Sequence, residues 1–200
     1  MARLEQLSQQ VLAVMAEIGQ YYSKYQQDRG LHCRSGCGEC CQHPGIEATV
    51  LEMLPLAFRL IAEQRADQVL SDLAERDDAR CYFYQSHSED RKQGQCSVYQ
   101  QRPGICRFFG AAGTTGKAGE YQLSTCRNIK TDHPTAYAET LIALESDPPP
   151  MMLKAKELVN ELDYELGKQH LPINDALQQA LERVLFKAWY SGMNDDQQIA

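Results

Sequence analysis

Residues 33–41 read Cys33-Arg34-Ser35-Gly36-Cys37-Gly38-Glu39-Cys40-Cys41, so four cysteines fall within nine residues. Gly36 and Gly38 give this stretch the backbone freedom to wrap around a bound group. Thiolates are soft ligands that suit zinc, iron in clusters or copper(I). Close thiols repel one another once ionised, and a bound cation removes that penalty. The stretch therefore predicts a metal-binding loop, whereas an isolated buried cysteine would count only as a small hydrophobic residue.

The adjacent pair Cys40-Cys41 constrains how such a loop binds metal. Neighbouring side chains point in different directions, so both cannot easily reach one tetrahedral ion. Two outcomes remain open: the pair is split between two metal ions, or only one member is a ligand.

A second group of cysteines lies further along the chain at long, irregular spacings that do not resemble paired zinc-ribbon knuckles. We expect the fold to bring it close to the first group. The predicted metal ligands are Cys33, Cys37, Cys40, Cys41, Cys81, Cys96, Cys106 and Cys126. Eight thiols could fill two four-thiolate zinc sites, two iron–sulfur clusters, or one site with spare or bridging thiols.

Composition limits the classes of partner and the cellular location. Twenty basic and 27 acidic residues give a net charge of −7, and no basic stripe is visible, so no nucleic-acid partner is expected. The chain shows neither a secretory signal nor an apolar run of membrane-spanning length, which predicts a cytoplasmic protein without a membrane partner. Thiols stay reduced in that compartment, so metal binding explains eight cysteines better than disulfides do.

Apolar residues recur at helical spacing on both sides of the cysteine-rich centre. The predicted helices cover residues 4–26, 47–64, 66–76, 135–145, 152–168 and 174–190. Pro55 lies inside the second helix and is expected to kink or split it.

Residues 79–127 carry few helical signals, and we expect only short β pieces at 81–84 and 96–99, a short helix beginning at Pro103, and a turn at 113–119. The predicted fold class is mainly α, with helices around an irregular cysteine-rich metal-binding centre. Its expected parts are an N-terminal helix (1–30), the metal-binding region (31–130) and C-terminal helices packed on it (131–200), forming one domain overall.

The cysteine loop, together with Gly94-Gln95-Cys96-Ser97-Val98-Tyr99 and Arg102-Pro103-Gly104-Ile105-Cys106-Arg107-Phe108, resembles the YkgJ-family cysteine cluster proteins. That family has a C-x2-C-x2-CC signature followed by C-x-[IV]-Y-x2-RP-x2-CR-x-F. The chain matches the later pattern throughout, and differs in having three residues rather than two between the first two cysteines. The resemblance covers about the middle half of the chain and implies a zinc- or iron-chelating domain.

Other residues near the cysteines have competing interpretations. His32 and His43 could be ligands, although surface loop histidines are the simpler interpretation. Arg102 and Arg107 could offset an anionic thiolate site or grip loop carbonyls. Tyr99 and Phe108 are expected in the core, where they would give the site a dry wall.

The sequence predicts a protein that binds zinc or iron, or an iron–sulfur cluster, through clustered thiolates, and it favours such a binding role over an enzymatic one without deciding between them. Two alternatives stay open. The first is a cluster-dependent enzyme, which would need a substrate pocket with convergent polar groups. The second is a thiol redox sensor whose cysteines oxidise reversibly. The C-terminal helices offer a surface for a protein partner.

Overall fold

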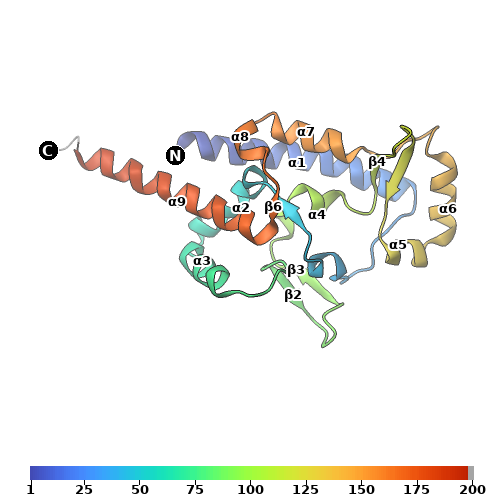
Figure 1. Ribbon diagram of the computed structural model, residues 1–200, viewed down its shortest axis with the longest axis horizontal. Coiled ribbons are helices and arrows are strands. Elements are labelled where there is room, and N and C mark those ends of the chain that lie inside the picture. Colours follow the sequence, from blue (N-terminus) through green and yellow to red (C-terminus); the bar gives the residue numbers. More distant parts are fainter. Residues whose placement is uncertain (198–200) are drawn as a thin grey trace.

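Helices dominate the computed structural model of the chain, which describes residues 1–197 and the side chains of residues 1–190 (Figure 1). The long helices are α1 (Ala2–Asp28), α2 (Val50–Ala62), α3 (Ala66–Glu75), α6 (Pro134–Ala143), α7 (Met152–Asn160) and α9 (Ile173–Gln197). Strands occur only as short antiparallel pairs. The mainly α fold class predicted from the sequence is therefore confirmed.

The hydrophobic core lies around α2, which packs against α1 on one side and α9 on another. Leu51 and Leu54 of α2 and Leu177 and Leu181 of α9 have no solvent-exposed surface. The helix continues through Pro55, so the predicted split is wrong. Pro55 is itself buried, and packing on both sides of α2 offsets the backbone hydrogen bond that proline cannot make.

Glu52 connects the start of α2 to the cysteine-rich centre. Thr49 and Glu52 form a capping box, in which the Thr49 backbone N–H donates to Glu52 Oε2 at 2.9 Å. The second carboxylate oxygen, Oε1, accepts a hydrogen bond from the Gly104 backbone N–H at 3.0 Å. One side chain therefore fixes both the N-terminus of α2 and the N-terminus of α4 (Gly104–Phe108).

The centre of the chain is built from short elements. They are η1 (Glu39–Gln42), β1 (Glu47–Ala48), β2 (Tyr84–Ser86), β3 (Gly94–Cys96), η2 (Tyr99–Gln101), β4 (Ala112–Thr115) and β5 (Tyr121–Ser124). β2 pairs with β3 and β4 with β5, while β1 pairs with β6 (Leu171–Pro172) just before α9. The turn predicted at 113–119 is the turn of the β4–β5 hairpin at residues 116–120, and residues 113–115 belong to β4 instead. The short helix expected after Pro103 is α4, and Pro103 caps it.

The helix predicted over residues 152–168 is broken after α7. Asp163 accepts a hydrogen bond from the Leu166 backbone N–H at 3.1 Å and so caps a separate helix, α8 (Tyr164–Gly167). A short helix that the sequence did not predict, α5 (Arg127–Asp132), precedes α6. Both differences arise from local caps, since Cys126 caps α5 as Asp163 caps α8.

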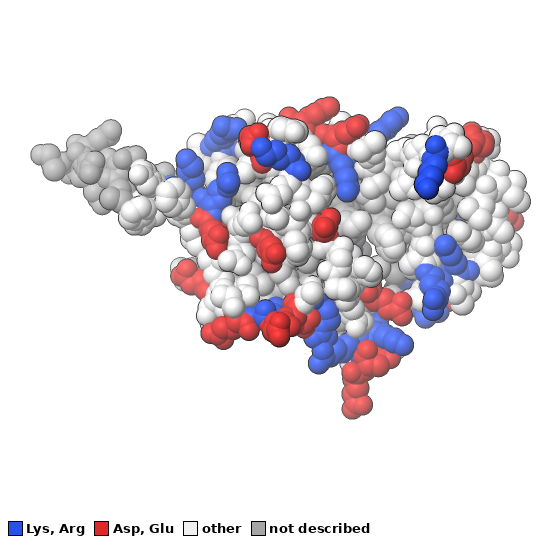
Figure 2. Space-filling model, in the orientation of Figure 1, with Lys and Arg blue, Asp and Glu red and all other residues white. Residues whose placement is uncertain are grey.

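Helix α9 runs past the body of the molecule (Figure 1) and carries the exposed, mutually contacting rings of Phe186, Trp189 and Tyr190. None of the helices in the described part of the chain is long and apolar enough to cross a membrane. Basic and acidic side chains are interspersed over the face shown in Figure 2.

Replacing Glu52 with Gln is expected to destabilise the fold by about 1–3 kcal/mol, because an amide NH2 would face one of two backbone donors that the carboxylate now satisfies. The midpoint of urea unfolding measures this loss. Glu17→Gln, on the exposed face of α1, is the control and should leave the midpoint unchanged. Equal midpoints for the two variants would contradict the anchoring role of Glu52.

Candidate metal centre

The cysteine loop is fixed by backbone contacts with the segment that leads into β3. The Gly94 N–H donates to the Gly36 carbonyl at 2.8 Å, and the Gly38 N–H donates to the Lys92 carbonyl at 3.0 Å. These bonds hold residues 36–38 against the β2–β3 hairpin although more than fifty residues separate them in sequence. The loop and the hairpin therefore form one frame for the thiols.

Two glycines of the loop have different roles. Gly36 adopts φ +70°, a left-handed conformation that favours glycine. Gly38 is needed for space, because a Cβ there would overlap the phenol ring of Tyr84. The sequence correctly indicated glycine freedom in this loop, but it could not show that an aromatic ring of β2 lies against Gly38.

Cys41, Cys81 and Cys96 are brought together by the hairpin. The Cys81 N–H donates to the Cys41 carbonyl at 3.3 Å. Cys96 lies opposite Tyr84 in the β2–β3 register, and the Tyr84 N–H donates to the Cys81 carbonyl at 3.1 Å. Cys106 reaches the same region from α4.

Cys126 follows strand β5 and is the N-cap of α5, where its Sγ accepts a hydrogen bond from the Ile129 backbone N–H at 3.4 Å. The N-terminal end of α5 faces the cysteine loop, because the Asn128 side-chain amide donates to Cys37 Sγ at 3.5 Å. The ion pair between Arg34 and Asp132 ties the other end of α5 to the same loop.

The electrostatic environment of the thiols shows which of them are neighbours. The pKa of Cys33 is raised to about 12, first by desolvation and then by the charges of Cys37, Cys126 and Cys40. The pKa of Cys40 is raised to about 11 by desolvation, followed by Cys126 and Cys37. Parts of Cys33 and Cys40 reach solvent, yet the surrounding protein removes enough water from both thiols to disfavour the thiolate.

The pKa values of Cys41, Cys81 and Cys106 are affected mostly by a different group of neighbouring cysteines. The pKa of Cys41 is raised to about 12 by desolvation and then by Cys81 and Cys96. Desolvation also raises the pKa of Cys81 to about 11, with a contribution from Cys96. The pKa of Cys106 lies well above its usual value because the thiol is desolvated and lies near Cys81 and Cys41.

These neighbour relations define two sets of thiols. We call Cys33, Cys37, Cys40 and Cys126 the first thiol set, and Cys41, Cys81, Cys96 and Cys106 the second thiol set. The sets do not follow the grouping in the sequence. Cys41 lies in the sequence group of Cys33 but belongs to the second thiol set, and Cys126 lies in the later sequence group but belongs to the first. Loop and hairpin are adjacent as expected, and the two sets meet at the Cys40–Cys41 peptide bond.

Arg102 lies beside the second thiol set. Its guanidinium stacks on the Tyr99 ring at 3.4 Å from the centroid, and its charge lowers the pKa values of Cys41, Cys96 and Cys106 against the larger effect of desolvation. Tyr99 is 59% exposed, so its predicted place in the core is wrong. The exposed Tyr99 ring therefore packs on the guanidinium of Arg102 at the surface of the molecule.

Arg107 and Phe108 hold the chain around Cys106. Arg107 donates from Nε to the Arg102 carbonyl at 2.7 Å and from its guanidinium to the Gln100 carbonyl, so it grips loop carbonyls. Phe108 is 2% exposed and stacks on Tyr22 of α1 with ring centroids 4.5 Å apart. The core position predicted for Phe108 is therefore confirmed.

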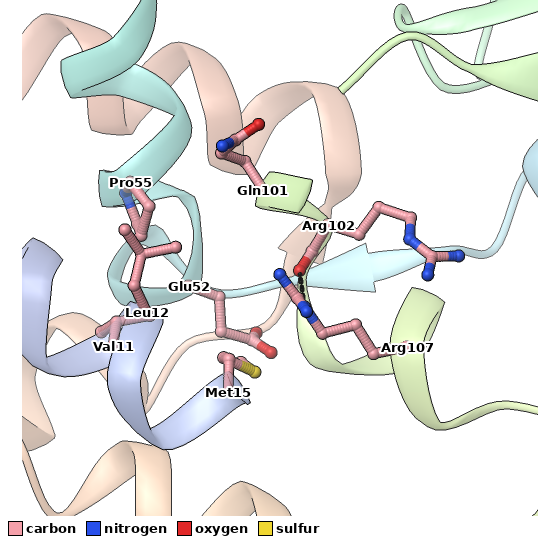
Figure 3. Close-up of a pocket in the computed structure, with 8 residues that line it drawn as sticks. All are labelled: Val11, Leu12, Met15, Glu52, Pro55, Gln101, Arg102 and Arg107. Carbon is pink, nitrogen blue, oxygen red and sulfur yellow. Dashed lines mark hydrogen bonds between the residues drawn. The ribbon is translucent and has the colours of Figure 1, made fainter. Parts of the chain in front are cut away.

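A shallow pocket lies between α1, α2 and the 101–107 segment (Figure 3). Its lining residues are Val11, Leu12, Met15, Glu52, Pro55, Gln101, Arg102 and Arg107. Glu52 and Arg107 are bound to backbone groups, and Gln101 accepts from Arg59 at 2.6 Å. These polar groups are engaged in holding the fold, and no cysteine lines the pocket.

The two histidines next to the loop make local contacts. His43 Nδ1 accepts a hydrogen bond from the Gly45 backbone N–H at 3.1 Å. The His32 carbonyl lies 3.1 Å from His133 Nε2, and the two rings meet edge to face.

Sequence reasoning missed two polar residues at the first thiol set. Asn128 donates to both Cys37 Sγ and Glu39 Oε2, the latter at 3.1 Å. Asp132 holds Arg34. The only available signal was their position shortly after Cys126, because nothing in the local sequence indicated that α5 would cover the loop.

The donors in both sets suit zinc and iron chemically, since each set offers four thiols without a competing histidine. In the described part of the chain, no group of three or more His, Cys, Asp or Glu side chains lies close enough together to hold a metal ion as it stands. A bound cation would hold the thiols of a set deprotonated and offset the repulsion between their charges.

Comparison with known proteins agrees with this donor chemistry. Residues 32–129 match the CxxCxxCC family, described as a "Putative zinc- or iron-chelating domain". This range begins just before Cys33 and ends just after Cys126, so it contains both thiol sets and Asn128. No curated protein and no solved structure matches the chain. Residues 32–129, just under half of the chain, are therefore similar to the CxxCxxCC family domain, which is described as zinc- or iron-chelating.

Proposed function

We propose that this protein binds metal at two centres, each held by four cysteine thiolates. The first thiol set would form one centre and the second thiol set the other. Zinc or iron is the metal, in agreement with the family. All eight predicted ligands are used, and each set has the four sulfurs that a tetrahedral zinc site or an iron–sulfur cluster requires.

The observation that carries the proposal is the divergence of Cys40 and Cys41. Desolvation raises both pKa values most. Among the neighbouring thiols, Cys126 and Cys37 act on Cys40 ahead of Cys41, whereas Cys81 and Cys96 act on Cys41 ahead of Cys37. Successive side chains in a 3₁₀ turn such as η1 point about 120° apart. This direction change supports two centres over a single centre with spare thiols.

Arg102 supports a closed site at the second set. Four thiolates around a divalent ion leave a net charge of −2, and a nearby guanidinium reduces the cost of holding that charge partly buried. Arg107 and Glu52 fix the 102–107 segment through backbone bonds, which keeps Cys106 and Arg102 on the same side. Arg107 and Glu52 therefore position the ligands in this proposal.

Cys40→Ser and Cys41→Ser are expected to remove different centres, so each variant should lose about half of the bound metal. The protein is purified without oxygen, and its metal and labile sulfide are measured together with its visible spectrum. Zinc without colour would identify thiolate zinc centres, and iron with sulfide and a brown colour would identify clusters. Ser35→Ala, an exposed change in the same loop, is the control and should retain all metal.

A wild-type protein that takes up a single equivalent of zinc, or a single cluster, would contradict the two-centre proposal. So would a protein without metal whose thiols cycle to disulfides, because that behaviour belongs to a redox sensor.

The stability of the metal-free protein should fall as pH rises from about 9 towards 11–12. Unfolded thiols ionise near 9.0, whereas the pKa values of Cys33, Cys40, Cys41 and Cys81 in the fold are about 12, 11, 12 and 11. The unfolded chain therefore releases protons first, and rising pH favours unfolding. Urea midpoints of the reduced protein at about pH 8 and about pH 9.5 measure the effect.

The same measurement on Cys41→Ser separates the thiols from the tyrosines, which ionise equally in both proteins. The variant should show a smaller fall with pH than the wild type. Metal-loaded protein should show a smaller fall than the metal-free wild type, since its thiolates are already deprotonated and only the tyrosines contribute. An equal fall in wild type, variant and loaded protein would refute the assignment to thiols.

A further inference from the structure

The two thiol sets differ in how they are attached to the fold. Three members of the second set, Cys81, Cys96 and Cys106, pack against the hydrophobic core. No member of the first set is among the residues that pack on this core, and Cys33 and Cys40 are exposed. The ligands of the second set therefore cannot separate without disturbing packed side chains.

Apart from the backbone bonds of Gly36 and Gly38 to the segment that leads into β3, the contacts that hold the first set are polar and lie at the surface. The loop is tied to α5 by the Arg34–Asp132 ion pair, whose side chains are 52% and 25% exposed. The Asn128 amide adds its bonds to Cys37 and Glu39. Exposed ion pairs contribute only about 0–1 kcal/mol and weaken in salt, so this frame opens far more easily than the core does.

The charges near the two sets are also unequal. Arg102 faces the second set, and its guanidinium is held there by the Tyr99 carbonyl, to which Nε donates at 3.1 Å, and by the Tyr99 ring. At the first set, Arg34 is already neutralised by Asp132, and Glu39 adds a negative charge beside Cys37 through the shared Asn128. A four-thiolate centre with a divalent ion is therefore less compensated at the first set, which favours release of the ion.

We infer that the two centres have different functions: the second keeps its ion as part of the fold, whereas the first exchanges its ion with a multidentate thiol acceptor. This inference rests on the two-centre proposal. In the exchange, an acceptor thiol loses its proton and its sulfur bonds to the ion, while the Cys33 or Cys40 sulfur leaves and takes up a proton. The ion keeps its oxidation state, so the step needs no oxidant or reductant.

Zinc-loaded protein challenged with excess 2,3-dimercaptopropanol tests this inference. One equivalent should leave quickly and the other at least about tenfold more slowly, a difference of about 1.4 kcal/mol in barrier. Cys40→Ser should lose the fast phase and Cys41→Ser the slow phase. Only Cys41→Ser should lower the unfolding temperature of the zinc-loaded protein substantially.

Arg34→Gln provides a test that leaves every thiol in place and does not depend on Cys41→Ser folding. It removes the tie between the loop and α5 and leaves the Asp132 carboxylate uncompensated, so both effects should accelerate the fast phase several-fold, while the slow phase and the unfolding temperature stay unchanged. Lys24→Gln removes a comparable exposed ion pair, with Asp28 of α1, and should alter neither phase.

Two equivalents released at the same rate would overturn the inference while leaving the two-centre proposal intact. A fast phase that survives in Cys40→Ser, or an Arg34→Gln protein that behaves like Lys24→Gln, would overturn it as well. A wild-type protein that never holds two equivalents would instead overturn the proposed function, and the inference with it.

Discussion

Two neighbouring side chains do not easily reach one tetrahedral ion, and Cys40 and Cys41 place that constraint at the centre of this fold. Successive side chains in the 3₁₀ turn η1 point about 120° apart. Among the neighbouring thiols, Cys126 and Cys37 act first on Cys40, whereas Cys81 and Cys96 act first on Cys41. The family signature is thus the point where the two thiol sets meet.

Opposing electrostatic effects act on these thiols. Desolvation and neighbouring thiols raise the pKa values of Cys33, Cys40, Cys41, Cys81 and Cys106, which favours their protonated forms. A cation would reverse both effects at once. The frame is nevertheless already assembled, because Glu52 and Arg107 bind backbone groups rather than ligands. Core packing and hydrogen bonds to the backbone therefore hold the scaffold. The thiols are not needed for these contacts, so in the proposed centres they would be available as metal ligands.

Helical periodicity was sufficient for the long elements, because an apolar face repeated over several turns leaves few alternatives. It failed where a single cap or a distant contact decided the outcome. The break after α7 depends on the Asp163 cap, and the β4–β5 hairpin depends on pairing between segments that look like a turn. Tyr99 was misplaced for a similar reason: its ring is exposed because Arg102 stacks on it, a contact that hydrophobicity does not reveal.

By itself, the sequence determined the mainly α class, the long helices, the donor type and the conflict between Cys40 and Cys41, because each of these depends on residues that are close together in the chain. Only the tertiary structure decided the partners. It joined Cys126 to Cys33 and Cys37, and Cys41 to Cys81, Cys96 and Cys106, because hairpin pairing and the placement of α5 bring distant segments together. Local sequence patterns do not show which distant segments come together, since spacing along the chain does not fix distance in the fold.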